Sequence, residues 1–446
     1  MIPMIDIAKV TAPSLLMTLY FWDYRDRKET ARYASQYKPF AIKTDDATFT
    51  PNDVSVVVPT IDWDESTLPA NIKTWMKNKV REIIFVTVRR DAEKLREFLR
   101  TTPCLGDIRM PCGGLPIPVK VVTVEQANKR RQLCRGFNEA EGDIIALVDD
   151  DAHWKTDRTM INLLAPFEYQ NVGLTGGPIT SYVPEERQNE SVITGWEVAA
   201  LRIRHRRRPG MAAFYAADMS TNFTISGLTM LMRAKIARDP YFQYLFINDT
   251  WAGVKENSSD DAWITRYILF QHHFPNREYS TIEPTEWKLG MQLTDDAEVQ
   301  TALLPDSRFV GQCKRWYKSG LRHRLNCLLY EPGREKMTQT APYMARKMLG
   351  GMLNPIFTFI RFVLWCLLIC WYPTIACIGG MYVLYAWIKS LMAFIDQYPY
   401  CASKIWAAVL ADELYLISDL YSWATINQDA WLNRPSVDGT PESQTT

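Results

Sequence analysis

An uncharged run of 27 residues near the C-terminal end constrains this chain more than any other feature. It extends from Phe362 to Ile388, whereas about 20 apolar residues suffice to cross the hydrocarbon core of a bilayer. Tryptophan and tyrosine lie near its ends, as is typical of membrane interfaces. Pro373 and Gly379-Gly380 interrupt the run, so two shorter spans with a tight link compete with one tilted span. The pattern predicts a protein whose membrane part lies near its C-terminal end.

A third apolar stretch, from Ile405 to Ile426, carries the carboxylates of Asp412, Glu413 and Asp419. Carboxylates are costly in lipid, so this stretch predicts either a buried bundle helix or an amphipathic helix at the interface. Ala12 to Trp22 is also apolar, but it has only about half the length of a span. Basic residues just upstream of the long run predict that the large N-terminal part faces the cytoplasm. They are Arg322, Arg324, Arg334, Lys336, Arg346 and Lys347.

Composition narrows the classes of protein that remain. Lys+Arg 51 against Asp+Glu 50 gives a formal net charge of +1, so the overall charge does not indicate a nucleic-acid partner. Hydrophobic residues make up 47% of the 446 residues, which is enough for a sizeable core and two or three domains. The 9 cysteines include no C-x-x-C pair, so neither a zinc site nor a disulfide framework is indicated.

Before the apolar region, segments typical of strands and helices alternate. Expected strands are Val54–Thr60, Glu82–Val88, Val119–Val124 and Asp143–Val148, and expected helices are Glu65–Lys79, Asp91–Thr101 and Gln126–Ala140. This alternation predicts a parallel, doubly wound α/β sheet, whose ligands bind beyond the carboxyl ends of the strands. An acidic triplet, Asp149-Asp150-Asp151, directly follows the fourth strand.

The triplet can be read in two ways. Alternate residues of an extended segment point to the same side, so Asp149 and Asp151 can converge while Asp150 faces elsewhere. Carboxylates this close repel each other, and a hard divalent cation with phosphate oxygens would relieve the repulsion. The alternative is a solvated acidic turn. Its position after a buried strand favours the metal site.

Two further motifs have both a chemical and a structural interpretation. Ala127 to Gln132 opens a helix with the cations Lys129, Arg130 and Arg131, which could neutralise a diphosphate or form a solvated basic face. Asp260-Asp261 precedes an apolar helical pattern. Helix capping accounts for one of these acids, and the other could act as a general base.

Two basic segments complete the set of motifs. Gln312-Cys313-Lys314-Arg315-Trp316 begins an amphipathic pattern that runs to Leu329, suited to a membrane surface or to sugar and phosphate contacts. The densest basic run is Arg202 to Arg208. We interpret it as a solvated helix face or a contact with anionic lipid, because no aromatic platform for nucleic acid accompanies it.

In their order and spacing, these motifs resemble the membrane-embedded family 2 glycosyltransferases, namely the hyaluronan, chitin and cellulose synthases. The likeness is strongest to fungal polysaccharide synthases of the hyaluronan-synthase type, and it covers about residues 54 to 434. The matching segments are Val54–Thr60 with Asp62, Asn128–Arg131, Asp149 with Asp151 as a D-x-D motif, Ser226–Arg233, Asp260–Arg266, Gln312 with Arg315 and Trp316 as a Q-x-x-R-W motif, and Trp431-Leu432-Asn433-Arg434.

The resemblance implies a GT-A domain that uses a UDP-sugar with Mg2+ or Mn2+. Thr60 and Asp62 would lie near the uridine, Lys129, Arg130 and Asp149 would bind the nucleotide sugar, and Asp151 with Asp149 would hold the cation. Asp261, beside Asp260, would take the proton from the acceptor hydroxyl, with inversion at the sugar. Gln312, Arg315, Trp316 and Gly227 would contact the diphosphate and the acceptor polysaccharide.

It also implies a division of the chain. The expected parts are a membrane-proximal or amphipathic segment at 1–50, a cytoplasmic catalytic domain at 51–310, interface helices at 311–352, two or three transmembrane helices at 353–430 and a polar tail at 431–446. Such a multi-pass protein would feed its polymer into the bilayer, and association with further copies of itself stays open.

Three departures from the family pattern and three alternatives remain. Thr87 stands where an acid usually ends the second strand, Leu432 and Asn433 replace small residues, and residues 1–50 lack a convincing transmembrane helix. A non-processive transferase acting on a lipid or short acceptor would share the catalytic residues, and an inactive membrane scaffold would have lost them. A phosphatase-like metal site would need an acid on the first strand, where Val58-Pro59-Thr60 offers none.

Overall fold

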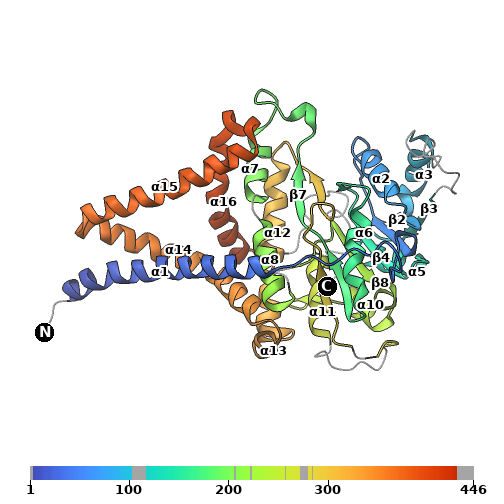
Figure 1. Cartoon of the computed structure of the whole chain (residues 1–446), viewed down its shortest axis with the longest axis horizontal. Helices are drawn as coiled ribbons and strands as arrows, with labels where there is room; N and C mark the ends of the chain where they lie inside the picture. The colour runs from blue at the N-terminus through green and yellow to red at the C-terminus, as the bar shows by residue number, and fades with distance from the viewer. Residues whose placement is uncertain are drawn as a thin grey trace.

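A computed structural model describes residues 4–102, 117–204, 207–220, 224–256, 258–271, 280–283 and 285–428. The polar tail expected at 431–446, with its Trp431-Leu432-Asn433-Arg434 motif, lies outside these ranges. Figure 1 shows an α/β body from which the long helices α1, α14 and α15 project to one side. Within the described ranges the body is built on a seven-stranded sheet of order β11-β6-β8-β4-β1-β2-β3.

The sheet is mixed. Its strands are β1 Val54–Pro59, β2 Glu82–Val88, β3 Val119–Val124, β4 Ile144–Val148, β6 Val172–Gly176, β8 Thr229–Arg233 and β11 Lys288–Met291. β1 to β4 occur where the sequence predicts strands, and they pair in parallel. β8 differs, because it lies between β4 and β6 and runs antiparallel to both. The long excursion between β6 and β8 is not a simple crossover helix, so the chain can re-enter the sheet from the opposite end.

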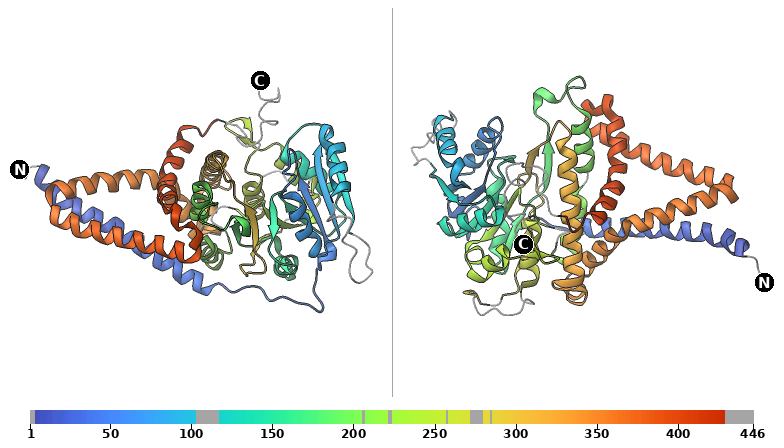
Figure 2. Two further views of the ribbon diagram at one scale, coloured as in Figure 1. Left: turned by 90° about the horizontal axis from the view of Figure 1, so that it is seen from above. Right: turned by 180° about the vertical axis from the view of Figure 1, so that it is seen from behind.

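Helices cover both faces of the sheet, as Figures 1 and 2 show. One face carries α2 (Leu68–Lys77), α3 (Ala92–Thr101) and α6 (Thr159–Leu164), and the other carries α5 (Lys129–Glu139), α10 (Pro240–Ile247) and α11 (Asp260–Phe270). Trp75 and Trp154 fill the first interface, and Phe137 and Tyr267 fill the second. These two apolar layers hold the carboxyl ends of β1 and β4 in fixed positions.

A smaller sheet extends beyond the end of β4. It consists of β5 (Ala152–Trp154), β12 (Val299–Ala302) and β7 (Ile179–Tyr182). β12 pairs antiparallel with β5 and parallel with β7. Because β5 begins directly after the acidic triplet, this sheet forms a wall at the edge where ligands are expected.

Further elements connect these layers. They are α8 (Arg207–Asp218), α9 (Ala234–Ala237), β9 (Thr250–Trp251), β10 (Val254–Lys255), the π-helical turn η6 (Asn326–Tyr330) and α13 (Arg334–Thr340). The π-turn directly continues α12 (Arg308–Leu325), which carries the Q-x-x-R-W motif.

Two helices of the described chain, α14 (Pro342–Trp371) and α15 (Pro373–Gln397), are long and apolar enough to cross a membrane. They meet at Tyr372, just before the proline that begins α15, so the uncharged run forms two helices rather than one tilted span. Large apolar side chains cover their exposed surface, among them Phe359, Phe362, Ile378 and Tyr382. The boundary expected at residue 353 falls inside α14.

The N-terminal helix α1 (Met4–Gln36) runs beside α14, as both views in Figure 2 show. Ala12 and Leu16 pack against Leu364 and Leu368. Three ion pairs then continue the contact toward the α/β body, Asp23 with Arg361 at 2.8 Å, Asp26 with Lys347 at 2.5 Å and Glu29 with Arg346 at 2.6 Å. Segments more than 300 residues apart in sequence therefore form one helical unit.

Helix α16 (Ile405–Ala424) packs against α7 (Gly195–Arg204) and α12 at the base of the projecting helices. Asp412 accepts two hydrogen bonds from the guanidinium of Arg202, each of 2.8 Å. This pairing offsets the cost of placing a carboxylate among apolar helices. The helix thus buries one face, whereas Trp406, Leu410 and Ile417 on its other face are exposed, so the structure does not choose between the two interpretations of this stretch.

Candidate active site

A cavity of about 2810 Å³ lies over the carboxyl ends of β1 and β4 and continues to α12, α14 and α1. A cavity for a small ligand measures roughly 300–1,000 Å³, so this one has room for more than a single nucleotide sugar. It brings together most of the predicted site residues. They are Thr60, Asp62, Lys129, Asp149, Asp151, Asp260, Asp261, Gln312, Arg315 and Trp316.

The three carboxylates of the acidic triplet have separate partners. Asp150 accepts a hydrogen bond from Oγ1 of Thr60 at 2.7 Å, and Asp151 accepts one from Oγ1 of Thr301 at 2.9 Å. Asp150 lines the cavity too, which contradicts the prediction that it faces elsewhere. The strand ends at Val148, and the backbone then turns, with the N–H of Ala152 donating to the carbonyl of Asp149. The alternation of an extended strand therefore does not continue through the triplet.

Lys129 forms a bridge between two parts of the site. Its ammonium lies 2.8 Å from a carboxylate oxygen of Asp149 and 3.0 Å from one of Asp260. Burial raises the pKa of Asp149 to about 7, and the charge of Asp151 adds to this while Lys129 opposes it. Burial alone would lower the pKa of Lys129, but the carboxylates of Asp149 and Asp260 reverse this and raise it. The lysine therefore stays charged and holds the two acids together.

The two acids at the start of α11 differ in their surroundings. Asp260 contacts Lys129, and although burial opposes ionisation, the lysine holds the pKa of this carboxyl below its usual range. Asp261 accepts hydrogen bonds from the N–H groups of Ala262 at 2.8 Å and Gly227 at 3.2 Å. Burial and the neighbouring charge of Asp260 raise the pKa of Asp261. A carboxylate with a raised pKa is better suited to accept a proton, so Asp261 is the stronger candidate for a general base.

Arg130 does not take part in this arrangement. Its guanidinium is 1% exposed and is not among the groups that line the cavity. It donates to the carbonyls of Phe246 and Ser258 at 2.8 and 2.9 Å, and to Asp249 at 3.0 Å. The prediction that Arg130 binds the nucleotide is therefore wrong, because the side chain of Arg130 points into the protein. Lys129 and Arg131 line the cavity instead. Arg130 supports the loop that leads to α11.

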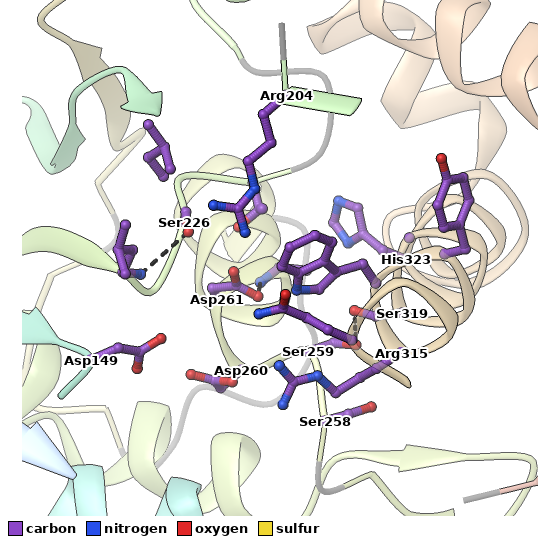
Figure 3. Close-up of a pocket in the computed structure, with 18 of the residues that line it drawn as sticks. Asp149, Arg204, Ser226, Ser258, Ser259, Asp260, Asp261, Arg315, Ser319 and His323 are labelled. Carbon is purple, nitrogen blue, oxygen red and sulfur yellow. Dashed lines mark hydrogen bonds between the residues drawn. The ribbon is translucent and has the colours of Figure 1, made fainter. Parts of the chain in front are cut away.

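Helix α12 closes the opposite side of the cavity. Arg315 and Trp316 follow Gln312 by three and four positions, so both lie on the same side of the helix as Gln312. All three residues line the cavity. Figure 3 shows that Ser319 and His323 continue this face. The Oγ atoms of Ser319 and Ser259 form a hydrogen bond that joins α12 to the start of α11. Sequence reasoning missed Ser319 and His323, although extending the helical spacing beyond Trp316 would have found them.

The residues present fit a divalent cation only together with a bound donor. No group of three or more His, Cys, Asp or Glu side chains in the described ranges is placed to hold a metal by itself. Asp149 and Asp151 supply two carboxylates whose mutual repulsion contributes to the raised pKa of Asp149. A hard cation prefers six or more oxygen ligands, and the oxygens of a diphosphate would complete the set.

Comparisons with known proteins agree with this geometry. A family model described as glycosyltransferase like family 2 matches residues 51–275. The chain is 32% identical to the NDP-glycosyltransferase ltbB of Aspergillus luteorubrus over 422 residues, which is 94% of this chain and 97% of that protein. It is 29% identical to a type 2 glycosyltransferase of Zymoseptoria tritici, over 66% of this chain and 55% of that protein.

Among solved structures, the chain resembles the mannosyltransferase PcManGT from Pyrobaculum calidifontis, determined in complex with GDP-Man and Mn2+. The alignment covers 95% of this chain and 98% of that one, with a TM-score of 0.55 and 14% sequence identity. At this identity the similarity concerns the fold. It extends over the long helices as well as the α/β body.

Proposed function

The chain belongs to glycosyltransferase family 2, and from this premise we propose that it is an inverting, processive synthase that transfers a sugar from a UDP-sugar to a growing polysaccharide. Its activity as a nucleotide-sugar glycosyltransferase follows from the family. The uridine nucleotide, the polymer and the processivity belong to the proposal. The observation that carries it is that the acidic triplet, Asp261 and the Q-x-x-R-W residues line one cavity.

The donor would bind over the ends of β1 and β4. Thr60 and Asp62 would lie near the uridine, and Lys129 and Asp149 near the diphosphate and sugar. Asp149 and Asp151 would hold Mg2+ or Mn2+, which when bound offsets the negative charge that develops on departing UDP. Lys129 already pairs with Asp149 in this structure, so it opposes the protonation that burial favours and holds this carboxylate in place before the donor arrives.

The acceptor hydroxyl would lie between Asp261 and the donor sugar. The acceptor hydroxyl oxygen attacks the anomeric carbon in line, the bond from that carbon to the diphosphate breaks, and UDP leaves with the bonding electrons. Asp261 takes the hydroxyl proton on its carboxylate. The N–H groups of Gly227 and Ala262 hold that carboxylate in one orientation. Gln312 and Arg315 would contact the diphosphate, and Trp316 would stack on the acceptor sugar.

The extent of the cavity supports a membrane-coupled reaction. It continues from Trp316 to Trp22 on α1 and to Phe357 and Arg361 on α14. Because α14 and α15 are long enough to cross a bilayer, we propose a multi-pass protein whose product leaves toward these helices. The basic residues upstream of the apolar run favour a cytoplasmic catalytic domain. The extent of the cavity also favours a second candidate function, a single transfer to a lipid-linked acceptor that enters from the bilayer.

The deciding experiment uses detergent-solubilised full-length protein with Mn2+ and a panel of UDP-sugars. UDP release and product length are measured together, with Asp261→Asn as the inactive variant and the exposed Asp157→Asn as a matched control. One active donor and a long product would support the synthase. Short products alone would favour single transfer. A folded wild-type protein that neither binds UDP nor releases it would overturn both functions.

A further inference from the structure

Two arginines of the basic run at Arg202 to Arg208 make contacts that the composition of the run does not suggest. The prediction of a solvated helix face is wrong for Arg202 and Arg204, the two arginines of the run whose side chains the structure describes. The side chain of Arg202 is 9% exposed and pairs with Asp412, which fixes α7 to α16. Arg204, two residues further on, lines the cavity that also contains Asp261.

Arg204 is in direct contact with the Q-x-x-R-W motif. The centre of its guanidinium lies 4.7 Å from the centroid of the Trp316 ring, a distance typical of a cation–π contact. One of its N–H groups donates to the hydroxyl of Ser181 on β7. Figure 3 shows Arg204 entering the site from a different side than Asp149 and Arg315. Its charged end is thus placed beside the indole on which the acceptor sugar would stack.

Helix α7 holds Arg204 at a fixed position relative to α12. Ala200 and Ile203 pack against Phe309 and Cys313 of α12 in a buried apolar cluster. In addition, the hydroxyl of Tyr415 on α16 donates to the carbonyl of Ile203 at 2.9 Å. These contacts come from helices on both sides, so the backbone that carries Arg204 is held beside the helix that carries Trp316.

We propose that Arg204 is a positioning residue of the acceptor subsite. Stacking on Arg204 fixes the plane of the Trp316 indole, and the N–H fork of the guanidinium, which is planar and always charged, donates hydrogen bonds to oxygen atoms of the acceptor saccharide. The inference rests on the proposed function and adds the residue that orients the acceptor toward Asp261. The two contacts described above, with Trp316 and Ser181, involve groups that are not assigned to the donor, which favours a role on the acceptor side of the reaction.

Water can be used as a probe that separates effects on the acceptor side of the reaction from effects on the donor side. A water molecule can replace the saccharide as acceptor, so that the donor is hydrolysed to UDP and free sugar, and it needs no orientation by Arg204. We therefore compare two rates in the same full-length protein with the donor that the wild type uses, namely release of free sugar and incorporation of sugar into product. Arg204→Gln should lower incorporation at least tenfold and leave hydrolysis within about twofold of wild type. Arg204→Lys keeps a cation over the ring but loses the fork, so its rate of incorporation should lie between those of wild type and Arg204→Gln.

The control is Arg135→Gln, which removes an exposed arginine of α5 that pairs with Glu139 outside the cavity. It should change neither rate. An equal loss of hydrolysis and incorporation in Arg204→Gln, or no loss of either, would overturn the inference. A failure of the proposed function would give a different result, because the wild type itself would incorporate no sugar into any saccharide. In that case the inference about Arg204 would also be wrong.

Discussion

The backbone N–H of Gly227 donates a hydrogen bond to Oδ2 of Asp261 at 3.2 Å. This contact joins the segment that precedes β8 to the first turn of α11, two parts of the chain that are 34 residues apart. It orients the carboxylate proposed to act as the base. The residue that provides it has no side chain, and its neighbours Ser226 and Leu228 line the cavity, so we propose that substrate uses the space beside the carboxylate.

Gly227→Ala tests whether that space is needed. An added Cβ would lie 3.4 Å from Cβ of Asp261, 3.6 Å from Oδ2 of Asp260 and 3.7 Å from Nζ of Lys129. These are ordinary contact distances, so the variant should fold with an unchanged melting temperature. The methyl group would occupy the proposed substrate space, and we expect transfer to fall by about tenfold to a hundredfold. Unchanged transfer at saturating donor would show that the space beside Gly227 is not used.

The metal requirement should depend on pH. Because the pKa of Asp149 is raised to about 7, this carboxyl becomes protonated as the pH falls through that value, and a protonated carboxyl binds cations poorly. The Mn2+ concentration that gives half-maximal transfer should therefore rise by up to about tenfold for each pH unit below 7. Titrating Mn2+ at several pH values between 5.5 and 8 measures this. A constant half-maximal concentration over that interval would contradict the assignment of Asp149 to the cation.

A buried ion pair at the base of α12 should dominate local stability. Nη1 of Arg322 lies 2.6 Å from Oε2 of Glu256, and their side chains are 4% and 5% exposed. Arg322 also donates to the carbonyls of Ile426 and Gln428. Arg322→Met would leave a buried carboxylate without this partner, which costs roughly 3–5 kcal/mol. Thermal unfolding in detergent should show a clear drop, and adding Glu256→Gln should recover part of it. A fully additive double variant would disprove the coupling.

The close packing of α5 on the sheet can be tested in the same way. A Cβ at position 136 would lie 2.3 Å from Cγ1 of Val57, so Gly136→Ala forces the helix away from β1. We expect a loss of about 1–3 kcal/mol, typical of overpacked cores. Gly210→Ala on α8 is the matched control, since nothing lies within 4 Å of the added atom. Equal stability of the two variants would contradict this account of the packing.

The sequence predicted the α/β body well because its strands are short β-branched runs with clear ends. β2 and β3 match the expected ranges, and β1 and β4 differ by a single residue. β8 was not predicted to run antiparallel, because strand direction depends on the route of the chain rather than on local residues. The prediction for Asp150 failed for a related reason. A turn follows β4, and residue types alone do not show where a strand stops alternating.

Among the site residues, the basic segments were the hardest to interpret. Lys129 and Arg130 are adjacent, and adjacent residues of a helix point in directions about 100° apart. Only the fold decides which of them lines the cavity. Likewise, a run of arginines looks solvated until the partners of Arg202 and Arg204 are known. The Q-x-x-R-W residues were easier, because Arg315 and Trp316 follow Gln312 by three and four positions and so lie on the same side of the helix as Gln312.

The role of Asp261 is the central claim, and it can be tested with one variant. Asp261→Asn keeps the size of the side chain and removes its capacity to accept a proton. In parallel with wild type and Asp157→Asn, UDP affinity is measured by calorimetry with Mn2+ present, and transfer is measured from labelled UDP-sugar. We predict that transfer falls by at least about 10²–10⁴-fold while UDP affinity stays within about threefold. Transfer at the wild-type rate, or loss of UDP binding with transfer retained, would contradict the account.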